Sequence, residues 1–259
     1  MSAGVPFDVR RFASIPSTNS YLLDEARRGA PEGLVAVADH QTAGRGRLGR
    51  PWEAPPGTSL LVSVLLRPVL EPDHLYLCTG LVALAAADAC TQVAGVEPGL
   101  KWPNDLVIGD KKVAGVLAEA DPSAPGGPPG SVAVVVGIGC NIDWPGPNGA
   151  TGTSLSEAAS RPVGRDELFG ALLANVAQRR PALEDANGRD RLVDELRRRS
   201  ATLGRRVRVQ RAGTQPLVGT ACALTVEGHL VVEGEDGEVE VAAGDVLLLR
   251  PDQGAKGRE

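Results

Sequence analysis

Three arginines alternate with glycines between Gly44 and Arg50 (GRGRLGR). Glycine lets backbone N–H groups approach the oxygens of a ligand closely, and a guanidinium donates paired hydrogen bonds to a carboxylate or a phosphate. The chain as a whole is acidic, with a formal net charge of −5, so this cationic cluster is a local feature. The segment predicts a clamp for a small anion, and an ordinary solvated surface loop is the alternative interpretation.

The same segment satisfies the GxGxxG spacing through Gly44, Gly46 and Gly49, so a Rossmann-type dinucleotide site has to be considered. In that fold a helix begins at the glycines, and its N-terminus binds the pyrophosphate. Here Pro51 and Pro55 follow closely, and proline does not fit inside a helix. We therefore reject the dinucleotide interpretation.

Lys101 is a second position with a charge that could do chemistry. Pro103 restricts the backbone beside Trp102, so the lysine can present its ammonium at a fixed place. A fixed ammonium stabilises negative charge that develops in a transition state. The alternative is an ordinary surface lysine, and Asn104 and Asp105 are also typical turn residues.

The chain has only three tryptophans, and each lies at the end of a segment marked by glycine or proline. Trp52 follows the arginines, Trp102 follows Lys101, and Trp144 follows a Gly-Cys-Asn sequence. Such rings are suited to forming the wall of a pocket or to stacking on a purine. A structural plug is the alternative, above all for Trp144.

The pattern of apolar residues predicts the elements that hold these side chains. The expected helices cover residues 17–28, 75–94, 166–179 and 189–199, and the expected buried strands cover 34–39, 59–67 and 131–142. Gly109 and Asp110 form the turn of a hairpin between the segments 100–108 and 111–120. These elements predict an α/β (α+β) domain over residues 1–200.

After about residue 203 the pattern changes to short β-like runs. They cover residues 205–210, 217–224, 229–234 and 238–250, with Gly213, Gly228 and Gly237 at turn positions. This pattern is typical of a small β-barrel, so we expect a β domain over 203–250 with a frayed tail. The sequence does not explain the Pro- and Gly-rich segment 121–130.

The overall composition excludes several classes of protein. The chain has 259 residues and is 42% hydrophobic, which is enough for a globular core, and its acidic balance argues against a general nucleic-acid binder. Its four cysteines are widely spread, so neither a disulfide framework nor a zinc site is expected. The N-terminus lacks an apolar signal segment, and the longest apolar run, 75–94, is too short to span a bilayer. We expect a cytoplasmic protein.

Five segments resemble the biotin–protein ligases, also called biotin–[acetyl-CoA-carboxylase] ligases. These segments are STN at 17–19, Q-x-x-GRGRxGR-x-W from Gln41 to Trp52, KWPND at 101–105, KKVAGVLAE at 111–119 and GIGCN at 137–141. They occur in the order of the family, and the resemblance covers almost the whole chain. The arginine segment together with KWPND is highly specific.

The resemblance implies a fold and a reaction. The fold is a class II synthetase-like catalytic domain with a mixed central sheet, followed by an SH3-like β-barrel. In the reaction, biotin and ATP form biotinyl-5′-AMP and pyrophosphate, with Mg²⁺ on the departing pyrophosphate. A lysine of a biotin carboxyl carrier domain of a carboxylase then takes the biotinyl group and releases AMP. Step one brings two anions together, so its barrier is largely electrostatic and positional.

The resemblance also assigns roles to single residues, and Lys101, Arg45 and Arg47 are the implied catalytic residues. The implied biotin site consists of Ser17, Thr18, Asn19, Gln41, Arg45, Gly46, Arg47, Lys101 and Gly115. The implied ATP site consists of Arg47, Arg50, Trp52, Lys101 and Asn141. No resident metal is implied.

One departure from the family and two rival functions remain. Some family members carry an N-terminal helix-turn-helix domain, but only sixteen residues precede Ser17, so we expect a monofunctional ligase that binds no DNA.

A lipoate–protein ligase shares the fold and the adenylate chemistry, whereas the polar residues of the implied biotin site favour biotin. A biotin sensor without catalytic activity is the other rival, and the intact Lys101 argues against it. We expect a monomer or a weak homodimer.

Overall fold

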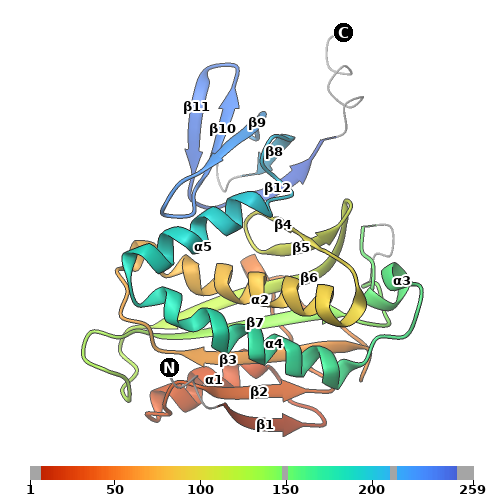
Figure 1. The fold of residues 1–259 in the computed structure, drawn as a ribbon, viewed down its shortest axis with the longest axis vertical. Coiled ribbons are helices and arrows are strands. Elements are labelled where there is room, and N and C mark those ends of the chain that lie inside the picture. Colours follow the sequence, from red (N-terminus) through yellow and green to blue (C-terminus); the bar gives the residue numbers. More distant parts are fainter. Residues whose placement is uncertain (1–6, 148–150, 211–214, 250–259) are drawn as a thin grey trace.

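The computed structural model describes residues 7–147, 151–210 and 215–249, which form two units (Figure 1). The larger unit is built on a mixed seven-stranded sheet. In spatial order its strands are β1 (Asp8–Phe12), β2 (Leu34–Ala38), β3 (Ser59–Leu66), β7 (Ala133–Asn141), β6 (Lys111–Asp121), β5 (Asp105–Ile108) and β4 (Gly99–Lys101). Only β1 and β2 pair in parallel, and the other neighbours are antiparallel. The expected mixed α/β domain is thereby confirmed.

Helices cover both faces of this sheet. The long helices α2 (Tyr76–Ala94), α4 (Arg165–Arg179) and α5 (Ala186–Arg198) lie on one side, and α1 (Thr18–Arg27) lies on the other (Figure 1). The short α3 (Leu155–Ala159) precedes α4. Ser17 caps α1, because its hydroxyl accepts a 3.4 Å hydrogen bond from the N–H of Ser20. The four helices predicted from the sequence are confirmed.

Successive side chains of β2 face two different cores, which explains why its sequence is apolar throughout. Val35 and Val37 face the core that contains α2, whereas Leu34 and Ala36 face the smaller core that contains α1. A strand that is buried on both faces needs an unbroken apolar run. For the same reason the strands predicted at 34–39, 59–67 and 131–142 are confirmed with small shifts at their ends.

Helix α2 is the central helix of the larger core and ends at Gly95, which has φ 69°. Together with the 3-10 turn η2 (Pro72–His74) it forms the segment Pro72–Ala94, which is 23 residues long and by length and composition could cross a membrane. The prediction that this run is too short to do so is therefore wrong. Its most apolar window is 72% buried inside the protein, so packing against the sheet and α4 accounts for its composition.

The smaller, C-terminal unit is a five-stranded antiparallel sheet. Its strands in spatial order are β11 (Gly237–Val241), β10 (Leu230–Gly234), β9 (Leu217–Leu224), β8 (Arg206–Gln210) and β12 (Asp245–Leu248). The last predicted run contains two strands instead of one. Gly228 and Gly237 have φ 80° and 105° and occupy turns as predicted, while Gly213 and the residues after 249 lie outside the described residues.

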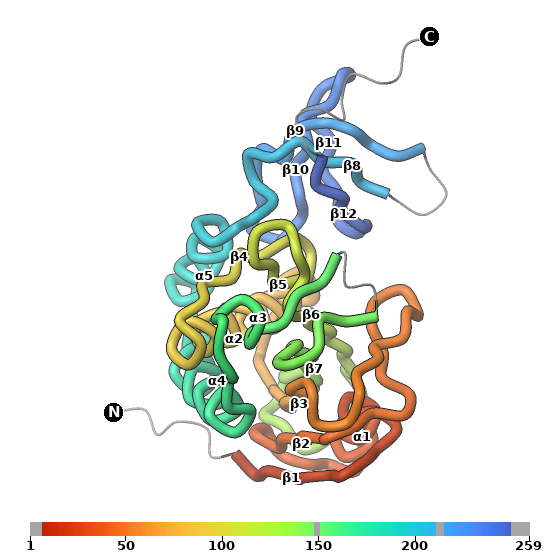
Figure 2. The backbone as a smooth tube through the Cα atoms, turned by 90° about the vertical axis from the view of Figure 1, so that its right-hand side faces the viewer, coloured from red at the N-terminus to blue at the C-terminus, as the bar shows by residue number. Residues whose placement is uncertain are grey.

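The two units meet at the end of the sheet where β4 and β5 lie (Figure 2). The hydroxyl of Tyr76 on α2 donates to the carbonyl oxygen of Val226 at 2.6 Å. Arg197 on α5 donates through Nε and Nη2 to the carbonyl oxygen of Leu224 at 3.0 and 2.8 Å. Because these hydrogen bonds join the two helices to the turn and strand of the smaller sheet, the C-terminal unit has a fixed place beside the larger one.

Candidate active site

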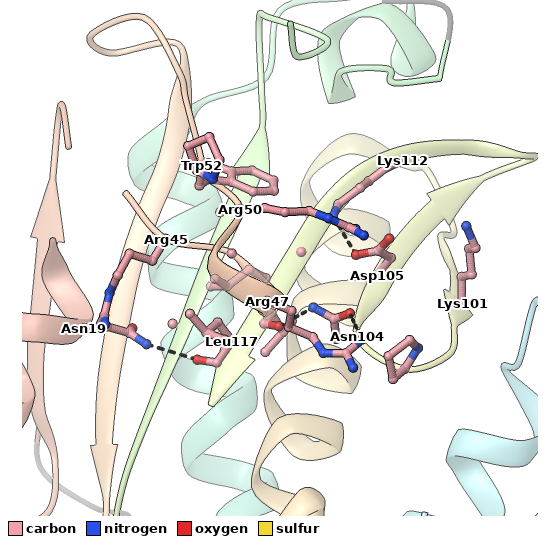
Figure 3. Close-up of a pocket in the computed structure, with 18 of the residues that line it drawn as sticks. Asn19, Arg45, Arg47, Arg50, Trp52, Lys101, Asn104, Asp105, Lys112 and Leu117 are labelled. Atoms are coloured by element: carbon pink, nitrogen blue, oxygen red, sulfur yellow. Dashed lines mark hydrogen bonds and ion pairs between the residues drawn. The ribbon is translucent and has the colours of Figure 1, made fainter. Parts of the chain in front are cut away.

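A cavity of about 220 Å³ lies between the arginine segment, strands β4 to β7 and strand β12 (Figure 3). It is lined by eleven of the twelve residues that the sequence assigned to the site. These are Ser17, Thr18, Asn19, Gln41, Arg45, Gly46, Arg47, Arg50, Trp52, Lys101 and Gly115. The twelfth, Asn141, lines an adjoining cavity of about 230 Å³ that shares Trp52 and Lys112 with the first. The structure therefore brings the predicted residues together.

The arginine segment is a small closed loop above the sheet. The N–H of Trp52 donates to the carbonyl oxygen of Gly44 at 2.9 Å, and the N–H of Gly46 donates to the carbonyl oxygen of Arg50 at 2.7 Å. A Cβ on Gly44 would lie 2.4 Å from the oxygen of Trp52, so this closure requires glycine. The 3-10 turn η1 (Arg47–Gly49) forms its tip. No α-helix follows, in agreement with the rejection of a dinucleotide fold.

Glycines on β6 and β7 form a floor on which side chains from other elements rest. Gly115 pairs with Gly139, and Gly137 pairs with Leu117 in the same ladder. A Cβ on Gly139 would lie 2.3 Å from the indole of Trp52. The Trp52 ring therefore rests directly on the sheet, and its buried Nε1 has no hydrogen-bond partner among the described residues. The glycines therefore let Trp52 and Asn19 lie against the sheet, and the cavity lies beside these side chains.

A chain of polar side chains closes one end of the cavity. The Oε1 atom of Gln41 accepts hydrogen bonds from the backbone N–H of Thr18 at 2.8 Å and from its hydroxyl at 3.0 Å. The Ser63 hydroxyl donates to Oδ1 of Asn19 at 2.6 Å and lies 2.7 Å from the Thr18 hydroxyl. Thr18, Asn19 and Ser63 are all buried, so this end offers oriented donors and acceptors in an otherwise apolar surrounding.

Three of the five cations that line the cavity are paired with carboxylates. Arg45 contacts Glu119 at 2.7 Å and Lys112 contacts Asp105 at 2.6 Å. Arg50 on the loop contacts Asp245 on β12. Lys112 also lies 5.3 Å from the centre of the Trp52 ring, a cation–π contact that holds the ring from above.

Arg47 and Lys101 are the two lining cations that form no ion pair in the described part of the chain. Arg47 donates to Oδ1 of Asn104 at 3.3 Å and to the carbonyl oxygen of Gly244 at 3.4 Å. Desolvation by burial lowers the pKa of the Arg47 guanidinium, which nevertheless stays charged at neutral pH. Lys101 is half-buried as a residue, and its ammonium has no hydrogen-bond partner there either. These two side chains are the ones that can receive an anion without first breaking an ion pair.

Two details of the arrangement go beyond the predicted set of residues. Lys101 stands at the opposite side of the close-up from Arg45, with Arg47 between them (Figure 3), so the three cations do not form one tight cluster. Asn141 is 5% exposed and donates to the carbonyl oxygen of Thr153 at 3.1 Å. Its amide therefore also holds the segment that follows β7.

Two of the three tryptophans, Trp52 and Trp102, show the two roles that the sequence left open. Trp52 lines both cavities. The indole of Trp102 packs against the core of the C-terminal unit and donates from Nε1 to the carbonyl oxygen of Gly228 at 2.9 Å, although Trp102 also lines the cavity. A plug between the units is thus the main role of Trp102.

Comparison with known proteins gives the same picture over nearly the whole chain. Residues 11–141 match the biotin/lipoate A/B protein ligase family, and residues 202–249 match the biotin protein ligase C-terminal domain. The chain is 37% identical to a biotin–[acetyl-CoA-carboxylase] ligase of Mycobacterium tuberculosis, with 92% of this chain and 88% of that protein covered.

The chain belongs to the biotin–protein ligase family.

Other relatives of this family extend the likeness. A biotin–[acetyl-CoA-carboxylase] ligase of Paracoccus denitrificans is 32% identical, with 91% of this chain and 98% of that protein covered. Among solved structures, a biotin protein ligase from Aquifex aeolicus in complex with biotin and ATP superposes with a TM-score of 0.78 at 26% identity. The match covers 94% of this chain and 99% of that one.

The structure adds lining residues of this ligase-family site that the sequence did not single out. Asp245 and Val246 come from β12, and Lys112, Asp105 and Gly139 come from the larger sheet. Glu119 does not line the cavity but contacts two residues that do. The segments KWPND, KKVAGVLAE and GIGCN contain four of these six residues, so those segments carried a signal. No motif in the sequence indicated that Asp245 would accept a contact from Arg50.

Proposed function

We propose that this chain is a biotin–protein ligase that works through biotinyl-5′-AMP. The observation that carries the proposal is the pair of cations without ion pairs, Arg47 and Lys101, beside a glycine floor with a polar closed end. The names of the related ligases, and the biotin and ATP in the Aquifex aeolicus complex, support the same activity.

In this proposal biotin lies on the glycine floor. Its ureido ring, which has both donors and acceptors, faces the polar end formed by Thr18, Asn19 and Gln41. Its valeryl chain runs past Gly115, beside the Lys112 and Trp52 side chains that lie against this glycine, and its carboxylate lies towards Arg47 and Lys101. The polar end of the cavity then recognises the ureido ring, and Arg47 and Lys101 promote the reaction of the carboxylate.

ATP enters as its Mg²⁺ complex, with the adenine in the adjoining cavity beside Trp52 and Asn141. The described residues contain no group of three or more His, Cys, Asp or Glu side chains that could hold a metal. Mg²⁺ commonly binds to substrate phosphates and keeps several waters, which fits a metal that arrives with the nucleotide. Arg50 lies near the rim of the cavity, where it can contact the departing phosphates.

The first step joins the two substrates. A carboxylate oxygen of biotin attacks the α-phosphorus of ATP, and the bond from that phosphorus to pyrophosphate breaks. The charges of Arg47 and Lys101 reduce the repulsion between the two anions and stabilise the added negative charge of the transition state. The loop above the floor shields the mixed anhydride from water.

The second step transfers the biotinyl group to a carrier. The amine of a lysine on a biotin carboxyl carrier domain attacks the acyl carbon, an amide forms, and AMP leaves with the bonding electron pair while the amine loses a proton. Lys101 can stay near the departing phosphate throughout.

We also propose a cytoplasmic location and a monomer or weak homodimer, with residues 1–200 as catalytic domain and 203–250 as accessory domain.

Biotin-dependent exchange between ATP and labelled pyrophosphate tests the first step. We expect exchange with biotin and no exchange with lipoate, because the polar end of the cavity suits a ureido ring better than a dithiolane. Exchange that depends on lipoate would indicate a lipoate ligase, and biotin binding without exchange would indicate a sensor. Transfer of labelled biotin to an isolated carrier domain tests the second step.

A further inference from the structure

Glu119 connects the arginine loop to the polar end of the cavity. It lies on β6 in the same alternation as Gly115 and Leu117, so its side chain emerges on the face of the sheet that forms the floor. Its Oε2 atom accepts hydrogen bonds from Nη2 of Arg45 at 2.7 Å and from Nδ2 of Asn19 at 2.9 Å. One carboxylate oxygen thus joins the loop to helix α1.

The amide of Asn19 is fixed by its other contacts. Its Oδ1 accepts from Ser63, and its Nδ2 also donates to the carbonyl oxygen of Leu117 at 3.2 Å. A Cβ on Gly137 would lie 2.1 Å from Oδ1, so Asn19 occupies the space that this glycine leaves. Only this orientation of the amide lets Nδ2 donate to the carbonyl oxygen of Leu117, so the sheet fixes the donor that Asn19 presents to Glu119.

The charges support a positional role for Arg45. Arg45 is neutralised by Glu119, whereas Arg47 and Lys101 form no ion pair among the described residues. An arginine that already forms an ion pair contributes little net positive charge to an incoming anion. Its side chain is 44% exposed, against 26% for Glu119, so the contact lies at the rim, where it can hold the loop down.

We propose that Glu119 is a positioning residue that fastens the arginine loop over the biotin end of the cavity through Arg45 and orients the amide of Asn19. This inference rests on the proposed function, because it concerns how that site retains biotin. Arg45 then holds the loop in place through this ion pair, and the carboxylate of biotin is bound by Arg47 and Lys101. Loss of Glu119 should weaken biotin binding much more than it slows the chemical step.

The test compares Glu119→Ala, Arg45→Ala and the double variant in pyrophosphate exchange. We expect each single variant to raise the KM for biotin about tenfold or more with kcat changed by less than about threefold. The double variant should be no worse than the more affected single variant, because both changes remove the same contact. Glu119→Gln retains an acceptor oxygen without the charge and should fall between wild type and Glu119→Ala.

Asp121→Asn is the matched control, because Asp121 lies on the same strand and pairs with Arg27 outside the cavity. It should leave both kinetic constants at the wild-type values. A second readout needs no activity: trypsin should cut after Arg45 and Arg47 faster in Glu119→Ala than in wild type or Asp121→Asn, while the melting temperatures stay similar.

Additive effects of the two single changes, or a wild-type KM and wild-type trypsin resistance in Glu119→Ala, would overturn the proposal. Absence of exchange in the wild-type protein would instead overturn the proposed function. In that case the trypsin comparison still decides whether Glu119 holds the loop.

Discussion

The indole Nε1 of Trp102 donates a 2.9 Å hydrogen bond to the carbonyl oxygen of Gly228, which is 126 residues further along the chain. The backbone N–H of Trp102 donates to the hydroxyl of Thr202 at 2.9 Å. Because Trp102 directly follows Lys101, these bonds fix the backbone that carries the unpaired ammonium. The C-terminal unit therefore helps to place Lys101, in addition to contributing Asp245 to the rim of the cavity.

Gly228→Ala tests this link between the units. Gly228 has φ 80°, and an added Cβ would lie 2.4 Å from the ring of Tyr76, so the turn must shift and the acceptor of Trp102 shifts with it. We expect a stability loss of about 1–3 kcal/mol and a decrease in exchange of about tenfold, measured by urea unfolding and by kcat.

Gly237→Ala is the control for backbone strain alone. Gly237 has φ 105° with nothing within 4 Å of an added Cβ, and it is the first residue of β11, directly after the turn from β10. This variant should lose stability but keep normal exchange. Equal losses of exchange in both variants would mean that the turn at Gly228 has no special connection to the site.

Lys101→Ala should abolish most of the adenylation without unfolding the protein. The Lys101 side chain has no ion pair or hydrogen bond in the described structure, so its removal leaves no buried partner unsatisfied, whereas the transition state loses a cation. We expect exchange to fall about 100- to 1,000-fold, with an unchanged urea midpoint. Lys111→Ala, which removes an exposed lysine that lies 3.5 Å from Glu157, should leave exchange unchanged. Near-normal exchange in Lys101→Ala would remove this residue from the mechanism.

The buried strands and long helices were predictable because their own sequences carry the signal. Strands β2, β3 and β7 are covered on both faces and therefore read as continuous apolar runs. Strand β1 was missed, since it is an edge strand with charged, mostly exposed side chains (DVRRF), which is how edges avoid pairing with other chains.

The ion pairs inside the site were harder to predict from the sequence than the list of residues that line it. The motifs place Arg45 and Arg50 in the cavity, but their carboxylate partners lie 74 and 195 residues away in sequence. Only the tertiary fold brings Glu119 and Asp245 to these arginines. The distinction between paired and unpaired cations, on which the assignment of the anion receptors depends, is therefore a result of the structure.

The Pro- and Gly-rich segment at 121–130, which the sequence did not explain, packs against Arg67. Arg67 is 1% exposed, and its guanidinium donates to the carbonyl oxygens of Ala26, Ala30 and Ala124. Arg67→Ala leaves these acceptors without partners inside the protein, so we expect a stability loss of about 3–5 kcal/mol. Arg28→Ala, at an exposed arginine that pairs with Glu25, should cost less than about 1 kcal/mol. Similar urea midpoints for the two variants would contradict this role of Arg67.

Glu195 makes stability depend on pH through a cluster that joins three helices. Both Nη atoms of Arg179 donate to its carboxylate at 2.8 Å, and Asp88 on α2 contacts Arg179 and Arg199. The hydrogen bonds from Arg179 lower the pKa of Glu195 below its ordinary value of 4.5. A carboxyl group with a lowered pKa stabilises the fold fully above that ordinary value, and the contribution disappears as the pH falls through the folded-state pKa.

Glu195→Gln should therefore be less stable than wild type at pH 7, and the gap in unfolding free energy should shrink as the pH falls below about 4.5. Urea unfolding between pH 7 and about pH 3 measures this gap across the range in which it should shrink. Glu184→Gln provides the comparison, because Glu184 is 69% exposed in its contact with Arg180 and a surface pair contributes little. If the gap for Glu195→Gln stayed constant or widened toward acid, the ion pair with Arg179 would not be the source of the stabilisation.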